Sequence, residues 1–224
     1  MTSTRPIIFA NHEIYHVYNR GVEKRPIFIT TRDYQRMVDT FHYYQYINTS
    51  LRFSHYLLLP KLDRVNYMQD IIKKAIKGVA ILAYCLMPNH FHFMIKQLQE
   101  DGISHFVANV TNSYTKYFNT KNKRVGPLVQ GAFKAVRVES DEQLIHLSRY
   151  IHLNPVSAFL IRLNKLDTYR WSSFMEYMGQ NDSKICDTTQ VRNHFLTIER
   201  YKQFVFDQAA YTMTSEKIKF ISFD

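Results

Sequence analysis

Residues 79–95 read VAILAYCLMPNHFHFMI, and this stretch decides the fold expected for the chain. Its first part, from Val79 to Leu86, is a continuous apolar run of strand length, which is typical of a buried β-strand. The pair Pro88-Asn89 is a turn signal, and the residues from His90 to Ile95 follow an alternating pattern again. The stretch therefore predicts a β-hairpin.

Strands and helices alternate on both sides of this hairpin. A first strand is expected at residues 14–18, before the turn signal Asn19-Arg20-Gly21, and a last strand at residues 128–138. Helical spacing of apolar residues is found at residues 30–47 and 103–118. The pattern predicts an α+β sandwich with a mainly antiparallel sheet.

Two helix starts carry capping-box patterns. Thr30 is followed by Asp33 at the third position, and Ser140 is followed in the same way by Gln143. The helix that opens at Ser140 should end near Asn154, because Pro155 disfavours helical geometry in the residue before it.

The chain is long enough for one main domain, which we place at residues 1–180. Residues 181–224 are nearly charge-balanced and helical in pattern, and they are expected to form a C-terminal helical accessory segment. The pattern of residues 48–77 is mixed, so their structure and role stay unassigned.

The charge of the chain points to a polyanionic partner. The formal net charge is +10, and residues 71–138 hold ten Lys and Arg against two acids, so they carry +8 of it. No apolar run approaches the roughly 20 residues that a membrane span needs, and the first residues lack the order of a secretory signal. We expect a cytoplasmic protein that does not bind membranes.

The second half of this basic region interleaves cations with aromatic residues. Such a mixture can neutralise phosphates and offer stacking surfaces to unpaired bases, although solvated charges around an aromatic core would give the same pattern. The near-absence of acids favours nucleic acid. The candidate nucleic-acid-binding residues are Lys116, Lys121, Lys123, Arg124, Lys134 and Arg137.

Two histidines of the expected second hairpin strand are candidate metal ligands. Side chains alternate along a strand, so His90 and His92 project from one face about 6 to 7 Å apart, while Phe91 and Phe93 face the other way. One divalent cation could bridge the two imidazoles, but hydrogen-bonded surface histidines show the same spacing. The chain has two cysteines, too few for a thiolate cluster, so any metal must use His, Asn or carboxylate ligands.

The helix expected after Ser140 carries a second pair of candidate residues. Tyr150 and Asn154 are four positions apart and therefore occupy one helix face, with Cβ atoms about 6 Å apart. A tyrosine hydroxyl has a reference pKa of about 10, and a metal that polarises a phosphate makes its attack on phosphorus easier. The same spacing also suits a tyrosine that only packs and an asparagine that only ends a helix.

Three separated motifs, taken together, resemble a known family. They are YCLMPNHFH at residues 84–92, GPLVQG at residues 126–131 and YIHLNPV at residues 150–156, in the order found in the single-tyrosine HUH transposases. The branch that they resemble most is that of the REP-associated tyrosine transposases, and the likeness extends from about His12 to Phe174. Ala132 departs from the arginine of many relatives, and Phe159 departs from a common glycine.

The resemblance implies a ferredoxin-like palm, the HUH endonuclease fold, with His90 and His92 on a sheet strand. It also implies that these histidines and Asn154 hold Mg²⁺ or Mn²⁺, and that Tyr150 is the catalytic nucleophile. The implied substrate is single-stranded DNA, often beside a hairpin formed by a palindromic repeat. A homodimer is left open, and with it whether Tyr150 acts on the metal site of its own chain.

These observations favour an enzyme that cleaves and rejoins single-stranded DNA through a 5′-phosphotyrosine. One alternative is a domesticated protein that binds repeat hairpins without catalysis. Another is an RNA-binding module, because ferredoxin-like sheets also stack RNA bases.

Overall fold

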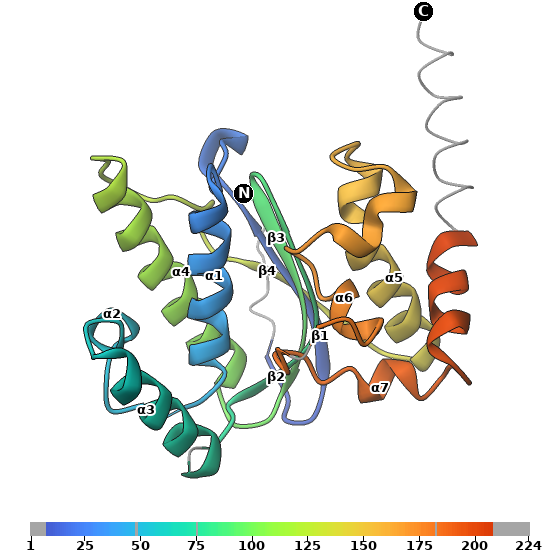
Figure 1. Ribbon diagram of the computed structural model, residues 1–224, viewed down its shortest axis with the longest axis horizontal. Coiled ribbons are helices and arrows are strands. Elements are labelled where there is room, and N and C mark those ends of the chain that lie inside the picture. Colours follow the sequence, from blue (N-terminus) through green and yellow to red (C-terminus); the bar gives the residue numbers. More distant parts are fainter. Residues whose placement is uncertain (1–7, 48, 75, 182, 208–224) are drawn as a thin grey trace, which may run out of the picture. The chain divides into compact units, whose positions relative to one another are not determined.

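The computed structural model describes residues 8–47, 49–74, 76–181 and 183–207. Its strands form one four-stranded antiparallel sheet in the order β2-β3-β1-β4. The strands are β1 (Ile14–Arg20), β2 (Val79–Met87), β3 (His90–Gln97) and β4 (Lys134–Val138). The main helices between and after them are α1 (Thr31–Tyr44), α4 (Gly102–Lys121) and α5 (Asp141–Ser157) (Figure 1).

This order of elements is the βαββαβ arrangement of ferredoxin-like folds. The predicted fold class, an α+β sandwich with a mainly antiparallel sheet, is therefore confirmed. The predicted hairpin is confirmed as well, with β2 and β3 joined by the turn at Pro88 and Asn89. All nine residues of β2 are buried, as the continuous apolar run required.

Other predicted boundaries shift. The first strand runs on to Arg20, the first long helix ends at Tyr44 rather than Ile47, and the last strand is limited to Lys134–Val138. The sequence before that strand, 128–133, is a connecting segment in which Val129 forms only an isolated bridge with Gly21.

The unassigned residues 48–77 contain two helices. They are α2 (Phe53–Tyr56) and α3 (Lys61–Lys74). Phe53 and Ile71 bury their side chains in one cluster with Tyr43 of α1 and with Tyr46, which follows α1, and this local core is rich in aromatic rings. Aromatic pairs of this kind add to the free energy gained by burying their surface.

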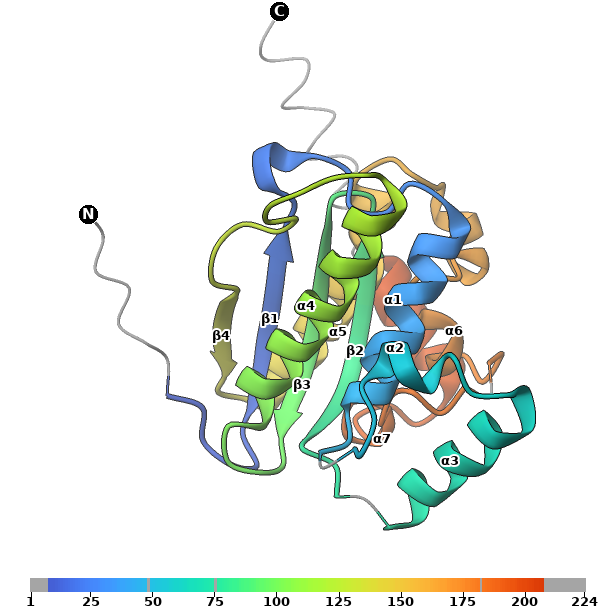
Figure 2. The same cartoon turned by 90° about the vertical axis from the view of Figure 1, so that its left-hand side faces the viewer.

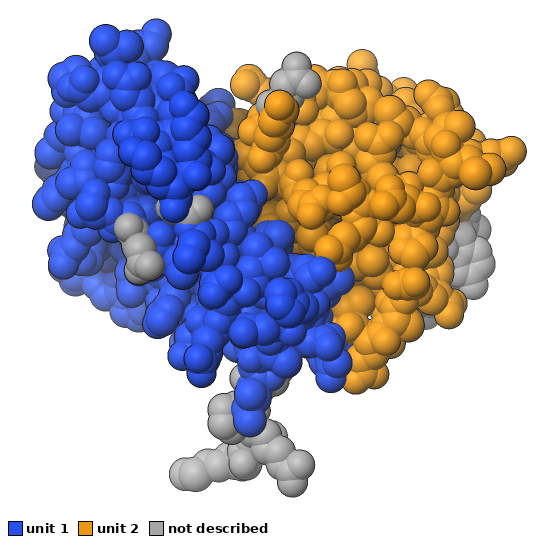
Figure 3. All heavy atoms as spheres, turned by 90° about the horizontal axis from the view of Figure 1, so that it is seen from below, with its two compact units in different colours: residues 1–80, 88–90, 95–137 blue, residues 81–87, 91–94, 138–224 orange. Residues whose placement is uncertain are grey.

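The chain divides into two compact units (Figure 3). The first comprises residues 1–80, 88–90 and 95–137, and the second comprises residues 81–87, 91–94 and 138–224. The first unit contains β1 and the packed pair of helices α1 and α4 (Figure 2). The second contains α5, η2 (Leu163–Thr168), α6 (Phe174–Tyr177), α7 (Thr189–Arg192) and a further helix over residues 198–207. The expected boundary near residue 180 stays a prediction.

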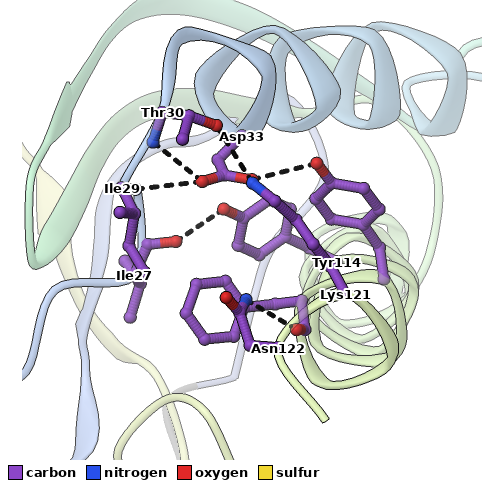
Figure 4. A network of polar contacts seen from close by, with 9 residues as sticks. Ile27, Ile29, Thr30, Asp33, Tyr114, Lys121 and Asn122 are labelled. Atoms are coloured by element: carbon purple, nitrogen blue, oxygen red, sulfur yellow. Dashed lines mark hydrogen bonds and ion pairs between the residues drawn. The ribbon is translucent and has the colours of Figure 1, made fainter.

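Asp33 organises the interior of the first unit. Its side chain is fully buried, and its carboxylate accepts hydrogen bonds from the backbone N–H groups of Ile29 and Thr30, from the Tyr117 hydroxyl and from Lys121 Nζ at 2.6 Å (Figure 4). The predicted helix start at Thr30 is thus confirmed, but Asp33 also ties α1 to α4. Nearby, the Tyr114 hydroxyl donates to the Ile27 carbonyl.

These contacts set the ionisation of Asp33. Burial alone raises the pKa of the carboxyl, but the hydrogen bonds from Lys121, the Thr30 N–H, Tyr117 and the Ile29 N–H outweigh burial and lower the pKa to about 2. The unfolded chain therefore takes up this proton first on acidification. The stabilisation is complete above about pH 4 and is lost as the pH falls towards 2.

We predict that Asp33→Asn lowers the free energy of unfolding by about 2 kcal/mol at pH 7 and flattens its pH dependence between pH 4 and 2. Urea unfolding at a series of pH values measures both effects. Asp63→Asn, at an exposed position of α3, is the matched control and should change neither. If the free energy of unfolding of Asp33→Asn falls as steeply between pH 4 and 2 as that of the wild type, Asp33 is not the group responsible for this fall.

Candidate active site on β3 and α5

The turn before His90 is fixed by a loop of its own unit. The Pro88 carbonyl accepts hydrogen bonds from the N–H groups of Ile27 and Phe28, and the Asn89 carbonyl accepts one from Gly21. At Gly21 a Cβ atom would lie 2.3 Å from the Arg25 carbonyl oxygen, so this close approach requires glycine. The start of β3 is thereby held in place from both sides of the turn.

His90 is oriented by the residue before it. Its Nδ1 lies 2.6 Å from the Asn89 side-chain oxygen, which can only accept a hydrogen bond, so Nδ1 carries the proton and donates. In the neutral ring the lone pair then sits on Nε2. Metal-binding histidines commonly have this arrangement, in which one ring nitrogen donates to an oxygen and the other binds the ion. Asn89 is a positioning residue that the sequence reasoning read only as part of a turn.

The structure brings His92 and Tyr150 together. His92 is buried in β3, and its ring meets the Tyr150 ring edge to face, with centroids 5.5 Å apart and planes 85° apart. Tyr150 lies on α5 and is 53% exposed. Two strand positions earlier, His90 lies on the same side of β3 as His92.

Asn154 lies one turn after Tyr150 on α5, as its spacing predicts. Its side-chain N–H donates to the Tyr150 carbonyl at 2.8 Å, so the amide nitrogen is engaged within the helix and the amide oxygen is turned away from that bond. An amide oxygen is a hard ligand that suits Mg²⁺ or Mn²⁺.

The prediction that this helix ends near Asn154 is wrong. α5 continues through Pro155 to Ser157, with Pro155 inside the helix. The end is formed instead by two hydrogen bonds, from Leu160 N–H to the Pro155 carbonyl and from Phe159 N–H to the Val156 carbonyl. This is the Schellman arrangement, and Phe159 takes the left-handed conformation with φ of 54°.

The inner face of α5 is anchored by His152. Its Nδ1 lies 2.7 Å from the Tyr201 hydroxyl and its Nε2 lies 2.8 Å from the Ser173 hydroxyl. Tyr201 also bonds to Ser148 of α5, and the Ser173 hydroxyl accepts from the Tyr84 N–H of β2. The partners of this buried imidazole are thus side-chain hydroxyls. No spacing signal pointed to Tyr201 or Ser173.

The exposed side of α5 contacts the helix at 198–207. Arg149, next to Tyr150, stacks its guanidinium on the Phe204 ring at 4.1 Å and donates to the Phe204 carbonyl. His146 contacts Arg149 at 2.5 Å and the Phe204 ring edge to face. These contacts restrain the helix turn that carries Tyr150.

The six candidate nucleic-acid-binding residues all belong to the first unit, but they differ in their surroundings. Lys121 is paired with Asp33, Arg137 forms an ion pair with Glu13 at 2.9 Å, and Arg124 bonds to Asn119 and the Pro127 carbonyl. Lys116, Lys123 and Lys134 are exposed. The structure thus gives Lys121 a structural role in addition to the predicted one.

Within the described residues, no group of three or more His, Cys, Asp or Glu side chains could hold a metal ion. A site built on His90, His92 and Asn154 would supply three neutral ligands and would depend on phosphate oxygens for negative charge. No helix in the described ranges is long and apolar enough to cross a membrane.

Comparison with known proteins places this geometry in context. Residues 61–154 match the sequence model of the family described as "Transposase IS200 like". The chain is similar to IS200-like transposases. The matched segment contains His90, His92, Tyr150 and Asn154, so the resemblance expected from the motifs is confirmed.

The fold has a counterpart among solved structures. A REP-associated tyrosine transposase bound to a REP hairpin matches with a TM-score of 0.52 and 15% sequence identity, over 84% of this chain and 98% of the other. At this identity the likeness shows a shared fold alone. No curated protein sequence matches the chain.

The His152 network makes a prediction about pH. Burial lowers the pKa of His152 to about 3, so on acidification the unfolded chain binds this proton well before the folded chain does. The stabilisation present above about pH 6.5 should therefore be lost as the pH falls, by about 2 kcal/mol between pH 6.5 and 5. His152→Gln keeps one hydrogen-bond donor and one acceptor. Its free energy of unfolding should be lower than that of the wild type at pH 7 and should depend less on pH between 6.5 and 5.

Chemical unfolding at pH 7, 6 and 5 measures this effect. His16 has its own lowered pKa, because of burial, and it titrates unchanged in both proteins. His194→Gln, at an exposed position, serves as the control. If the free energy of unfolding changes with pH equally in His152→Gln and the wild type, His152 is not the buried neutral group.

Phe159 gives a prediction about stability. Glycine adopts its left-handed conformation without steric cost, and the exposed Phe159 ring contributes little packing. Phe159→Gly should raise the free energy of unfolding by about 0.5 to 1 kcal/mol in urea titrations. Ser157→Gly, within the helix, should lower it by a similar amount. A loss of stability in Phe159→Gly would refute the strain argument.

Proposed function

We propose that the protein is a metal-dependent nuclease and strand transferase of the transposase type, acting on single-stranded DNA. The observation that carries this proposal is the half-exposed Tyr150, placed on α5 with its ring against His92. A nucleophile must be accessible to its substrate, and the exposure of Tyr150 meets this requirement. Similarity to IS200-like transposases supports the same reading.

The reaction is a transesterification at phosphorus. The Tyr150 oxygen attacks the scissile phosphate and loses its proton, while the bond from phosphorus to the 3′ oxygen breaks and that oxygen takes up a proton. The products are a 5′-phosphotyrosine and a free 3′-hydroxyl. Because the phosphodiester bond energy is conserved in the tyrosyl ester, attack by another 3′-hydroxyl rejoins the strands without an external energy source.

The donor set fits a divalent cation. His90 through Nε2, His92 and the Asn154 amide oxygen would hold Mg²⁺ or Mn²⁺, and Asn89 fixes the His90 tautomer that this requires. When bound, such an ion polarises the phosphate and stabilises the negative charge that develops on it. The three protein ligands are neutral, so the ion keeps its full charge for the DNA.

The DNA is proposed to lie next to a hairpin. Support comes from the structural neighbour, which is bound to a REP hairpin. The basic residues of the first unit would neutralise its phosphates. A non-catalytic hairpin-binding protein would use the same basic residues, and the fate of Tyr150 distinguishes the two functions.

We predict that the protein forms a covalent adduct with hairpin-bearing single strands in the presence of Mn²⁺, and that Tyr150→Phe abolishes it. The phenyl ring keeps the packing against His92 but lacks the attacking oxygen. Denaturing gel electrophoresis with end-labelled DNA detects the adduct. Chelation of the metal should suppress it, and added Mn²⁺ should restore it.

The matched control is Tyr34→Phe, which removes a hydroxyl from α1 in the first unit and should leave adduct formation unchanged. An adduct formed by Tyr150→Phe would show that another residue is the nucleophile. Hairpin binding without any adduct, indifferent to Tyr150 and to metal, would favour the non-catalytic alternative.

A further inference from the structure

A cavity of about 680 Å³ lies in the first unit, lined by α1, α4 and the residues around the start of α2. None of the residues that form it belongs to the candidate active site on β3 and α5. Its volume is in the range that holds a small organic ligand, and it exceeds what one inorganic anion would fill. We call it the α1/α4 cavity.

The lining of the α1/α4 cavity is cationic and contains no carboxylate. Its charged members are Arg32, Arg36, Arg52, Lys116 and Lys121. The charge of Lys121 is compensated by the buried Asp33, as Figure 4 shows. The other four have no ion pair with a carboxylate among the salt bridges of the described residues, so the cavity keeps a net charge of about +4.

Arg36 is the cation of this cavity whose charge is least well solvated. Its guanidinium stacks on the Phe53 ring at 4.5 Å and on the Tyr117 ring at 5.2 Å. Its buried Nε has no hydrogen-bond partner among the described residues. Burial lowers the pKa of Arg36, which means that the charged form lacks solvation there. Asp39 compensates part of the Arg36 charge, and an anion in the cavity would add to this compensation.

The remaining lining groups match a nucleotide better than a bare anion. Tyr44 and Tyr117 bring aromatic rings, and Ser54, Asn109 and Asn112 bring hydroxyl and amide groups that can both donate and accept. Arginines bind phosphate oxygens in a bidentate manner, and aromatic rings stack on bases of any sequence.

We propose that the α1/α4 cavity binds one phosphorylated nucleotide, with the phosphate on Arg32, Arg52 and Lys116 and the base against the tyrosines. The nucleotide is either free or a unit of a single DNA strand, and the choice of DNA rests on the proposed function. Phosphate binding itself does not depend on Tyr150 chemistry. Three of the arginines, Arg32, Arg36 and Arg52, precede the basic region that the sequence singled out.

The test uses the full chain in a chelating buffer, so that no cleavage occurs. Fluorescence anisotropy measures binding of a labelled single strand without a hairpin, at several stated salt concentrations. Arg32→Gln with Arg52→Gln removes two exposed charges, and Lys61→Gln with Lys73→Gln removes two exposed charges from α3 as the matched control.

The double variant Arg32→Gln/Arg52→Gln, called the cavity pair below, should bind the strand at least about tenfold more weakly than the wild type. The slope of its log affinity against log salt should be smaller by about 1.4, because two phosphate contacts are lost. The control pair should change affinity by less than about threefold. Unfolding transitions like that of the wild type show that the variants fold. Equal affinities for the cavity pair and the control pair would overturn the proposal, and so would a loss confined to a matched RNA strand.

Competition distinguishes the two sources of the nucleotide. Displacement of the strand from wild-type protein by deoxyadenosine monophosphate, but not by inorganic phosphate, supports a site that accepts a free nucleotide. If the mononucleotide does not displace the strand, but the cavity pair still binds the strand more weakly than the wild type, the bound nucleotide is a unit within a strand. A competitor effect of inorganic phosphate equal to that of the mononucleotide would overturn the role of the base.

Failure of this inference is distinguishable from failure of the proposed function. Adduct formation depends on Tyr150, and cavity binding is measured without cleavage. If the wild type forms no adduct but the cavity pair binds DNA weakly, the nucleotide site is supported and the nuclease function is not. If the wild type forms the adduct and the cavity pair binds DNA normally, only the nucleotide site is contradicted.

Discussion

The two-residue period of β3 is the constraint on which the candidate site depends. A strand with alternating faces must commit Phe91 and Phe93 to one side, where they are buried, and it thereby places His90 and His92 together on the other. The fixed turn at Pro88 and Asn89 sets the register, because a shift of one residue would exchange the two faces. Apolar packing and candidate chemistry are thus determined by the same strand.

The rotation of α5, the helix that carries Tyr150, is fixed as well. α5 exposes Tyr150 while burying His152 two positions later, and these residues point to different sides of the helix. The hydrogen bonds of His152 to Tyr201 and Ser173 define one rotation, since a turned helix would leave a buried imidazole without partners. Burial keeps the imidazole neutral, so the anchor adds no charge next to the site.

Local patterns were predictable from the sequence, and compensations between distant residues were not. The hairpin, the strand at Ile14–Arg20 and the helix starts follow from periodicity and capping, which act over a few residues. The pairing of Asp33 with Lys121 joins residues far apart in sequence, so charge counting alone left Lys121 as a free cation. The predicted helix end near Asn154 failed for a different reason. The local rule for the residue before Pro155 was applied, whereas hydrogen bonds from the later residues Phe159 and Leu160 set the end of the helix. The arginines of the α1/α4 cavity were missed because charge was counted along the chain, whereas the fold gathers it across helices.

The residues proposed for the reaction and those proposed for DNA binding fall largely in different units. His92, Tyr150 and Asn154 lie in the second unit, and the six predicted DNA-binding residues lie in the first. A nucleophile benefits from a rigid setting with few competing charges, whereas phosphate binding benefits from flexible cations in contact with solvent. β3 contributes residues to both units, with His90 counted in one and His92 in the other.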